Sequence, residues 1–428
     1  MYDFGVDTRI FPDREYRPRI ADAQLSRLLG VGGAVVIEGP RACGKTMTGL
    51  HAARSAALLD DPAVRSLMEL SPQAVLAGER PRLLDEWQLA PDLWNLVRRE
   101  VDASKHPGSF ILTGSAVPSD DLTRHTGAGR FLRMRLRTMT WAERGGSTGA
   151  VSLGALIDGE RPVSDTSSMA FEEVVEEMSR TGFPALAQLA PAEAAVALRS
   201  YVDDVVRADL GRLAEVRHEP ALLRALLLAL ARSTASEVSW QTLAKDLRQA
   251  GPAITPETVS RYVALLERLF VVERVPAWVV GLRSRARLRS APKWHLADPA
   301  LALAVLDADA ARLSQDPQTA GLIFESAVVH DLLVLAQDLD GTLCHYRDSN
   351  GHELDAVITL PGGRWVAIEV KLGASQIKAG AESLAKAVAQ VDPAVAGEPV
   401  LRLVVTGTGP ILTLPDGTVT CPLSALGA

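Results

Sequence analysis

The chain has 428 residues, which is enough for two to four domains that each bury a hydrophobic core. Hydrophobic residues make up 47% of it and charged residues 23%, as in ordinary globular proteins, whereas aromatic residues are sparse at 5% and argue against a stacking platform for single-stranded nucleic acid. The formal net charge of −7 argues against a protein that grips duplex nucleic acid along its whole length.

The charge is unevenly distributed along the chain. Residues 195–320 hold 17 Lys/Arg against 14 Asp/Glu, a balance of +3. Residues 321–428 hold 6 against 12, a balance of −6. We therefore expect any contact with nucleic acid to be local and centred on the middle region.

The cysteines and the apolar runs indicate a compartment. Cys43, Cys344 and Cys421 are far apart and form neither a disulfide framework nor a metal-binding spacing, which suits a reducing cytosol. Residues 1–18 are polar and charged and contain no apolar signal core. No apolar run reaches the length needed to cross a bilayer. We therefore expect a cytoplasmic protein that acts without a membrane.

The first motif is a complete phosphate-binding loop, G-x-x-x-x-G-K-[ST], at residues 39–46. The β-branched run at 33–38 predicts a strand before it, and residues 47–59 predict a helix after it. Strand, glycine loop and helix N-terminus in this order are what a phosphate site requires. The eight predicted nucleotide-contacting positions are Gly39, Pro40, Arg41, Ala42, Cys43, Gly44, Lys45 and Thr46.

Each fixed position of this loop has a physical role. Gly39 and Gly44 allow backbone conformations in which successive N–H groups point at an anion. Lys45 can reach the β- and γ-phosphates as a mobile point charge. Thr46 offers a hydroxyl to Mg²⁺, which prefers oxygen ligands. The predicted ligands are therefore ATP and Mg²⁺.

A pair of acids follows the next apolar strand, at residues 82–86. In P-loop ATPases one carboxylate holds Mg²⁺ and the next orients the attacking water, and Asp85 and Glu86 are the candidates for these roles. The alternative is an ordinary strand that ends in solvated acids. A further strand at 110–115 ends in polar residues, so Thr113 or Ser115 could sense the nucleotide, although Thr-Gly-Ser is also a common turn.

Strict alternation at residues 130–137 predicts a strand with Arg133, Arg135 and Arg137 on one face. Such a face could supply an arginine finger to a neighbouring subunit of a homo-oligomer, or it could simply be solvated. Residues 145–168 are rich in Gly, Ser and Asp and predict a loop or linker. Residues 171–213 then predict helices interrupted at Gly182-Phe183-Pro184.

The middle region predicts three helices and a β-hairpin, which is the winged-helix arrangement. The helices are expected at 222–231, 239–249 (capped by Ser236 or Ser239) and 257–270, and the strands at 271–275 and 281–293. Four wing arginines alternate and could meet the phosphates of duplex DNA. They are Arg283, Arg285, Arg287 and Arg289. The alternative is a wing used for packing or for contact with a protein partner.

The C-terminal region predicts a helix at 322–335 and strands at 344–347, 353–358 and 365–371. Asp355 followed by Glu369-x-Lys371 on the next strand is a spacing used by metal-dependent nucleases. Asp355 and Glu369 would bind Mg²⁺, Lys371 would position or activate water, and Glu325 could complete the shell. The alternative, favoured by the acidic balance of this region, is a nuclease-like fold that no longer cuts.

Taken together, these residues resemble a large prokaryotic family of P-loop ATPases in which an AAA-type core is joined to a C-terminal domain catalogued as DUF4143. The resemblance covers nearly the whole sequence. Its segments are Tyr16-Arg17-Pro18-Arg19, the loop G-P-R-A-C-G-K-T, L-L-D-E-W-Q at 83–88, I-L-T-G-S at 111–115, Gly182-Phe183-Pro184, residues 201–210, Pro292-Lys293, Phe324-Glu325 and Ile368-Glu369-Val370-Lys371.

The resemblance implies ATP binding at residues 39–46, Mg²⁺ handling by Asp85 and Glu86, and a restriction-endonuclease-like C-terminal fold. One departure is Trp87, where the family usually has a smaller residue such as Ile. Trp87 stands beside the carboxylates and replaces neither, so both acids that the resemblance implies for hydrolysis are retained.

We therefore predict an α/β chain with a P-loop ATPase parallel sheet, a helical and winged-helix region, and a C-terminal α/β PD-(D/E)xK-like domain. The expected boundaries are 1–150 for the ATPase domain, 151–220 for a linker and helical region, 221–320 for the winged helix and 321–428 for the nuclease-like domain. The expected function is Mg²⁺-dependent ATP binding and hydrolysis that repositions the later regions on DNA or a protein partner. The alternatives are an ATP-gated nuclease and a non-hydrolytic, ATP-controlled binding module.

Overall fold

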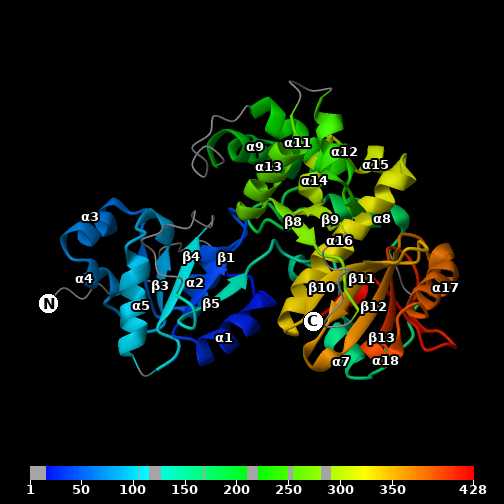
Figure 1. Ribbon diagram of the computed structural model, residues 1–428, viewed down its shortest axis with the longest axis horizontal. Helices are drawn as coiled ribbons and strands as arrows, with labels where there is room; N and C mark the ends of the chain where they lie inside the picture. The colour runs from blue at the N-terminus through cyan, green and yellow to red at the C-terminus, as the bar shows by residue number, and fades with distance from the viewer. Residues whose placement is uncertain are drawn as a thin grey trace. The chain divides into compact units, whose positions relative to one another are not determined.

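The computed structural model describes residues 16–104, 106–114, 127–166, 169–209, 220–248, 254–280 and 291–428 (Figure 1). The chain divides into two compact units. The first contains Met1–Thr138 together with Arg268–Phe270, and the second contains Met139–Glu267 and Val271–Ala428. The finer division into four domains stays a prediction.

The first unit is a five-stranded parallel sheet, in the order β2-β3-β4-β1-β5, with helices on both faces. Its strands are β1 (Ala34–Glu38), β2 (Ser55–Leu58), β3 (Arg82–Asp85), β4 (Phe110–Gly114) and β5 (Phe131–Arg135). Its helices are α1 (Ala21–Val31), α2 (Lys45–Ala52), α3 (Pro62–Leu70), α4 (Pro72–Leu76), the short 3₁₀ turn η1 (Trp87–Leu89) and α5 (Leu93–Ala103).

Strands β1 and β4 are buried on both faces, which explains why they are nearly continuous apolar runs, whereas the edge strand β5 also contains exposed and partly exposed residues. Val36 belongs to a core with Trp94 and Val97 of α5, whereas Val35 and Ile37 belong to a core with residues of α1 and α2. Each fully buried side chain of this size contributes about 1.5–3 kcal/mol. The parallel strands therefore hold their carboxyl ends at one edge of the sheet, where ligands gather in open α/β folds.

The helix predicted for residues 47–59 is wrong in its second half. Helix α2 ends at Ala52, and residues 55–58 form strand β2, which pairs with β3 in the register Ala56↔Leu83. A short apolar run cannot be assigned to helix or strand from periodicity alone. The tertiary context decides here, because Ser55 is tied to the strand's surroundings by hydrogen bonds to Glu79 and from Arg82.

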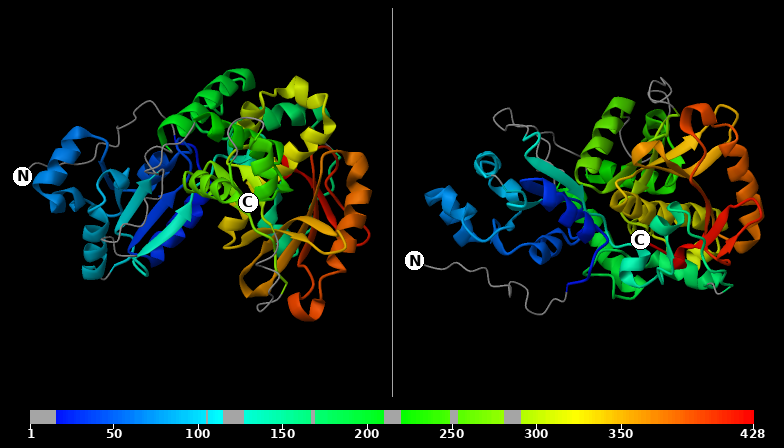
Figure 2. Two further views of the ribbon diagram at one scale, coloured as in Figure 1. Left: turned by 45° about the horizontal axis from the view of Figure 1, so that its top comes forward. Right: turned by 90° about the horizontal axis from the view of Figure 1, so that it is seen from below.

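The second unit combines helices with a six-stranded mixed sheet and two small sheets (Figures 1 and 2). The large sheet has the order β10-β11-β12-β13-β15-β14; β10–β12 are antiparallel, and β12, β13 and β15 are parallel. Its strands are β10 (Thr342–Arg347), β11 (Glu353–Thr359), β12 (Trp365–Lys371), β13 (Leu401–Thr406), β14 (Leu412–Thr413) and β15 (Val419–Pro422). Helices α17 (Ile377–Val388) and α18 (Pro393–Ala396) follow β12, and side chains of α17 share a core with those of β11, β12 and β13.

The helical part of the second unit precedes and supports this sheet. Its helices are α6 (Trp141–Arg144), α7 (Leu153–Ile157), α8 (Phe171–Ser179), α9 (Pro191–Asp204), the π-helical turn η2 (Val205–Asp209), α11 (Pro220–Arg232), α12 (Trp240–Leu247), α13 (Pro256–Arg268), α14 (Pro299–Leu306), α15 (Ala310–Ser314) and α16 (Pro317–Asp338). The chain is therefore α/β, with an N-terminal parallel sheet, a helical middle and a C-terminal mixed sheet, as predicted.

The middle region contains three helices and a three-stranded sheet. Strands β7 (Ser236–Glu237), β8 (Val272–Val275) and β9 (Lys293–Leu296) pair antiparallel in the order β7-β9-β8. Ser239 is the N-cap of α12 and accepts a hydrogen bond from the Thr242 N–H, whereas Ser236 lies in β7. The wing arginines predicted at 283–289 lie outside the described residues.

The linker predicted at 145–168 contains regular structure. Strand β6 (Val151–Ser152) pairs with β16 (Leu426–Gly427) near the chain's end, and α7 begins directly after β6 with Ser152 as its N-cap. Leu153 and Leu156 of α7 are buried. The Gly- and Ser-rich composition did not indicate these elements. Val151 pairs with Leu426, which lies 275 positions later, and such a distant pairing leaves no local signal in the sequence.

Helix α16 corrects a second expectation. Within the described residues it is the one helix that is long and apolar enough to cross a membrane by length and composition, with a mean hydropathy of 1.6. However, 72% of that apolar window is buried inside the protein, which is the behaviour of a core helix. The helix begins at Pro317 because the Asp316 side chain caps it by accepting from the Thr319 N–H.

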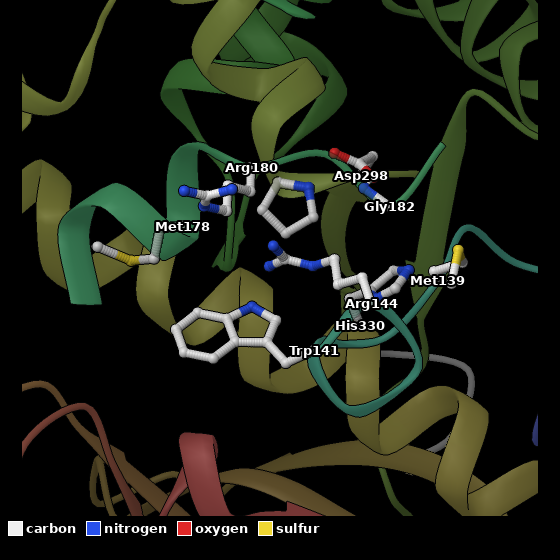
Figure 3. Close-up of a pocket in the computed structure, with 9 residues that line it drawn as sticks. Met139, Trp141, Arg144, Met178, Arg180, Gly182, Asp298 and His330 are labelled. Carbon is white, nitrogen blue, oxygen red and sulfur yellow. Dashed lines mark hydrogen bonds between the residues drawn. The ribbon is translucent and has the colours of Figure 1, made fainter. Parts of the chain in front are cut away.

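The chain enters the second unit through a buried anchor around α6 (Figure 3). The Met139 N–H donates to the Gly182 carbonyl at 2.7 Å, and the Trp141 N–H donates to Asp331 Oδ2 at 2.9 Å. The Arg144 guanidinium pairs with the Glu177 carboxylate and donates to the Glu177 carbonyl at 3.0 Å. These contacts fix residues 139–144 in the core of the second unit.

Candidate functional site

The phosphate loop runs from the end of β1 to the start of α2. Gly44 is the N-cap of α2 with φ of 107°, a conformation that favours glycine. A Cβ on Gly39 would stand 2.0 Å from the Leu136 carbonyl oxygen, so only glycine allows the loop to approach the end of β5 this closely. The Cys43 thiol is buried and donates to the same Leu136 carbonyl at 3.3 Å. The loop is thus packed directly against residues 136–137.

Lys45 and Thr46 lie at the first turn of α2, where free N–H groups favour an anion. Lys45 is buried, and its Nζ donates to the carbonyls of Gly39 at 3.0 Å and Pro40 at 2.7 Å. The ammonium is therefore held over the loop by weak neutral acceptors, which a phosphate oxygen can outcompete. The Thr46 hydroxyl donates to Asp85 Oδ1 at 2.9 Å.

Asp85, at the end of β3, connects strand β4 with the first turn of helix α2. Strand β4 lies between β1 and β3, and Thr113 on β4 stands opposite Asp85 in the register. The Thr113 hydroxyl donates to Asp85 Oδ1, so the carboxylate accepts from both Thr46 and Thr113. Burial raises the pKa of Asp85, and the two hydroxyl hydrogen bonds act against that rise. A divalent cation would relieve this desolvation penalty.

Glu86 follows Asp85 in a left-handed backbone conformation, with φ of 52° and ψ of 42°. Such a conformation is uncommon for a residue with a side chain and is often found at functional sites. The Gln88 side-chain amide donates to Glu86 Oε2. Trp87 points instead into the core, where its ring lies 5.0 Å from that of Trp94. The large side chain of Trp87 is therefore packed in the hydrophobic core.

Arg19 is a supporting residue to which the sequence analysis assigned no role. Its buried guanidinium donates to the Cys43 carbonyl at 3.1 Å and to the Arg137 carbonyl at 2.9 Å. It therefore joins the phosphate loop to the segment that follows β5. Tyr16 supports α2 nearby, since its ring stacks on His51 at 4.0 Å and its hydroxyl donates to Asp22 at 2.6 Å.

The remaining predictions for the ATPase region concern the nucleotide sensor and the arginine face of β5. Ser115 lies outside the described residues, so of the two sensor candidates the structure places Thr113 at the site. In the predicted arginine face, Arg133 is 45% exposed in its side chain and pairs with Glu38. On the other face of the alternation, which predicts Leu132, Met134 and Leu136 together, Met134 and Leu136 are buried and Leu132 is partly buried.

These residues fit a nucleoside triphosphate with Mg²⁺. The loop N–H groups and Lys45 would hold phosphate oxygens, and Thr46 and Asp85 offer the oxygen donors that Mg²⁺ prefers. When bound, the cation would neutralise charge on the phosphates. Glu86, whose side chain accepts from Gln88, would then be the adjacent carboxylate that orients water.

The C-terminal residues predicted from the D…E-x-K pattern form a second polar cluster, now centred on Lys293 of β9. Lys293 Nζ lies 2.8 Å from Glu325 Oε1 of α16, 2.8 Å from Glu353 Oε1 and 3.9 Å from Asp355 Oδ1 of β11. Asp355 Oδ2 accepts from the Val370 N–H at 2.8 Å. The sequence analysis assigned no role to Glu353 or Lys293.

Glu369 and Lys371 share one face of β12, as predicted, and contact each other. Lys371 Nζ lies 2.7 Å from Glu369 Oε1, whereas Glu369 Oε2 is buried with no hydrogen-bond partner. In the described part of the chain, no group of three or more His, Cys, Asp or Glu side chains is arranged to hold a metal ion. The Mg²⁺ site at Asp355 and Glu369 therefore stays a prediction.

The pKa values in this cluster reflect burial together with crowded charge. Burial, and next the Asp355 charge, raise the pKa of Glu325 to about 8 and that of Glu369 to about 7. Burial also raises the pKa of Asp355, against the opposing effect of Lys293. Lys293 has its pKa raised above the ordinary value, because its carboxylate neighbours outweigh its burial. The ammonium is therefore charged at neutral pH.

Comparison with protein families divides the chain into three matches. A family profile described as "AAA domain" matches residues 32–144, "Domain of unknown function (DUF8612)" matches 171–312, and "Domain of unknown function (DUF4143)" matches 320–426. The DUF8612 match covers most of the helical middle, which the motifs of the sequence did not single out as a family of its own.

Similar proteins include two uncharacterized mycobacterial proteins, Mb2031c of Mycobacterium bovis and Rv2008c of Mycobacterium tuberculosis. Each is 27% identical over 361 residues, which span 82% of this chain and 73% of the relative. Among solved structures, the Walker-type ATPase PABY2304 of Pyrococcus abyssi is similar at 13% identity with a TM-score of 0.39, covering 68% of this chain and 96% of that one. The chain thus joins an N-terminal AAA ATPase domain to a C-terminal DUF4143 domain, the architecture that its motifs indicated.

Proposed function

We propose that the chain binds ATP with Mg²⁺ at residues 39–46 and hydrolyses it with Asp85 and Glu86. The observation that carries this proposal is the hydrogen-bonded set Thr46, Asp85 and Thr113, which brings the phosphate loop and two neighbouring strand ends to one point. Asp85 would bind the cation through its oxygen atoms, and Glu86 would orient water and accept its proton. The AAA-domain match supports the same activity.

The Mg²⁺ requirement tests this assignment. In Asp85→Asn, we expect the Mg²⁺ concentration for half-maximal phosphate release to rise about 10–100-fold, as when an oriented metal-site partner is lost. The amide keeps the size of the side chain but removes its charge. Phosphate release would be followed across a Mg²⁺ titration at saturating ATP. Asp92→Asn, at an exposed position of the same unit, is the matched control; equal Mg²⁺ curves for all three proteins would refute the role of Asp85.

We further propose that the nucleotide site acts on the second unit through residues 136–144. The phosphate loop contacts Leu136 through Gly39 and Cys43, and Arg19 ties the loop to Arg137. Beginning at Met139, the same stretch of chain is fixed in the core of the second unit. A shift of the loop on ATP binding would therefore pull on a covalent connection that is anchored at its far end.

The part moved in this way is, we propose, a winged helix that meets duplex DNA or a protein partner. This part of the chain consists of three helices and an antiparallel sheet. The elements follow in the chain order α11, β7, α12, α13, β8 and β9, and the strands pair in the order β7-β9-β8. The four arginines between β8 and β9 supply basic charge. We propose the cytoplasm as the site of action.

Salt dependence distinguishes the two kinds of partner. If the arginines meet phosphates, Arg285→Ala together with Arg287→Ala should reduce the slope of log affinity against log salt by about 1 for each lost contact. Fluorescence anisotropy of a labelled duplex measures this, with the exposed Arg161→Ala as the control. Affinity unchanged by salt and by both wing substitutions would exclude duplex contact through the wing and leave a protein partner.

A further inference from the structure

The carboxylate cluster of the second unit encloses a lysine. Lys293 is 3% exposed, and its ammonium touches Glu325 and Glu353 and lies near Asp355. An ammonium carries only hydrogen-bond donors, so carboxylates are its natural partners; here Glu325 and Glu353 lie at 2.8 Å and Asp355 at 3.9 Å. Glu325 and Asp355 are also carboxylates that a divalent cation would need at this site.

Lys293 reaches the cluster from a different sheet. Its strand β9 pairs with β7 and β8, in the registers Glu237↔Lys293 and Val275↔Lys293, whereas its carboxylate partners belong to α16 and β11. The ammonium therefore joins the three-stranded sheet to the nuclease-like part of the second unit. Separating the three-stranded sheet from α16 and β11 would leave buried charges without a partner. We therefore expect this contact to be costly to break.

We propose that Lys293 is a built-in counter-cation of this carboxylate cluster, which takes the place of a divalent metal and excludes it from Glu325, Glu353 and Asp355. The wild-type cluster is then a structural joint and has no metal-dependent nuclease activity. Removing the ammonium should create a site for a hard divalent cation such as Mn²⁺. The proposal does not depend on ATP hydrolysis.

Two observations support the expectation that the cluster would accept additional positive charge. Glu369 is 4% exposed, and its Oε2 atom is buried with no hydrogen-bond partner. Glu325 and Asp355 share Lys293 as their counter-ion, at 2.8 and 3.9 Å, so these carboxylates act as one electrostatic group. With Lys293 removed, the same group would hold one positive charge fewer and would bind a divalent cation more strongly.

Mn²⁺ binding to nucleotide-free protein tests the proposal. We expect Lys293→Met to bind Mn²⁺ at least about tenfold more tightly than wild type, measured by the electron paramagnetic resonance signal of free Mn²⁺. The gain should disappear in Lys293→Met/Asp355→Asn. Lys378→Met, which removes an exposed lysine from α17, changes the net charge equally and should bind as wild type does. A folded Lys293→Met protein that binds no more Mn²⁺ than wild type would overturn the proposal.

Thermal unfolding supplies a second readout, because Lys293→Met leaves buried carboxylates uncompensated. Mn²⁺ should raise the Tm of this variant by more than it raises the Tm of wild type, since a ligand that binds only the folded state stabilises it. If Lys293→Met does not fold in any buffer, wild type and Asp355→Asn still decide the matter. Equal Mn²⁺ binding by these two proteins supports the proposal, and weaker binding by Asp355→Asn contradicts it.

Discussion

Replacing Glu86 by Gln should lower phosphate release from ATP by about 10²–10⁴-fold while leaving ATP affinity nearly unchanged. Glutamine has the shape of glutamate but cannot accept a proton from water. Glu86 is only half-buried, directly follows Asp85, and is held in a left-handed conformation that Gln88 supports. The substitution therefore removes the ability to accept a proton while retaining the position of the side chain.

Lys45→Ala provides the contrast that separates chemistry from binding. Lys45 is buried against the loop carbonyls, and its charge is the main attraction for the phosphates, so its loss should weaken ATP binding as well as hydrolysis. Equilibrium binding of a fluorescent ATP analogue and single-turnover phosphate release measure the two effects. Glu79→Gln, an exposed acid in the same unit, is the control. Glu86→Gln turning over at the wild-type rate, or losing ATP binding as Lys45→Ala does, would exclude Glu86 as the proton acceptor.

The candidate nucleotide site is visible in the sequence because its signals are local. The loop pattern, the run of β1 and the carboxylates after β3 each lie within a few residues, and parallel strands bring their ends to one edge. Sequence alone does not place Thr113 beside Asp85, and the prediction for Ser115 stays untested because that residue lies outside the described ranges. The register that sets Thr113 opposite Asp85 follows from β4 lying between β1 and β3, which is a property of the sheet.

The features that the sequence did not predict depend on contacts between distant segments. Strand β6 exists because it pairs with β16, and β2 because it pairs with β3. Lys293 is the first residue of β9, and its neighbours in the sequence give no sign of a special role. The carboxylates that surround its ammonium come from α16 and β11, which lie later in the chain. Glu353 was missed for the same reason, since a lone acid at the start of a strand is usually solvated.

The anchor at α6 should be the most sensitive point of the second unit. In Arg144→Met, we expect the free energy of unfolding of this unit to fall by about 3–5 kcal/mol, because Glu177 loses its buried partner. The Arg144 side chain is 5% exposed and that of Glu177 is 11% exposed. Burial lowers the pKa of Arg144 and raises that of Glu177, so for both groups desolvation outweighs their mutual attraction. Denaturant unfolding followed by tryptophan fluorescence would measure the loss.

Burial disfavours the charged forms of both Arg144 and Glu177. The intact ion pair therefore adds less to the free energy of unfolding than is lost when only one partner is removed. The double variant Arg144→Met/Glu177→Gln should therefore recover part of the stability that Arg144→Met loses. Arg180→Met is the matched control: Arg180 also pairs with Glu177, at 3.3 Å, but it is 38% exposed, so its loss should change stability by at most about 1 kcal/mol. If Arg144→Met is no less stable than Arg180→Met, the anchor does not hold residues 139–144, and the proposed connection from the phosphate loop to the second unit loses its fixed end.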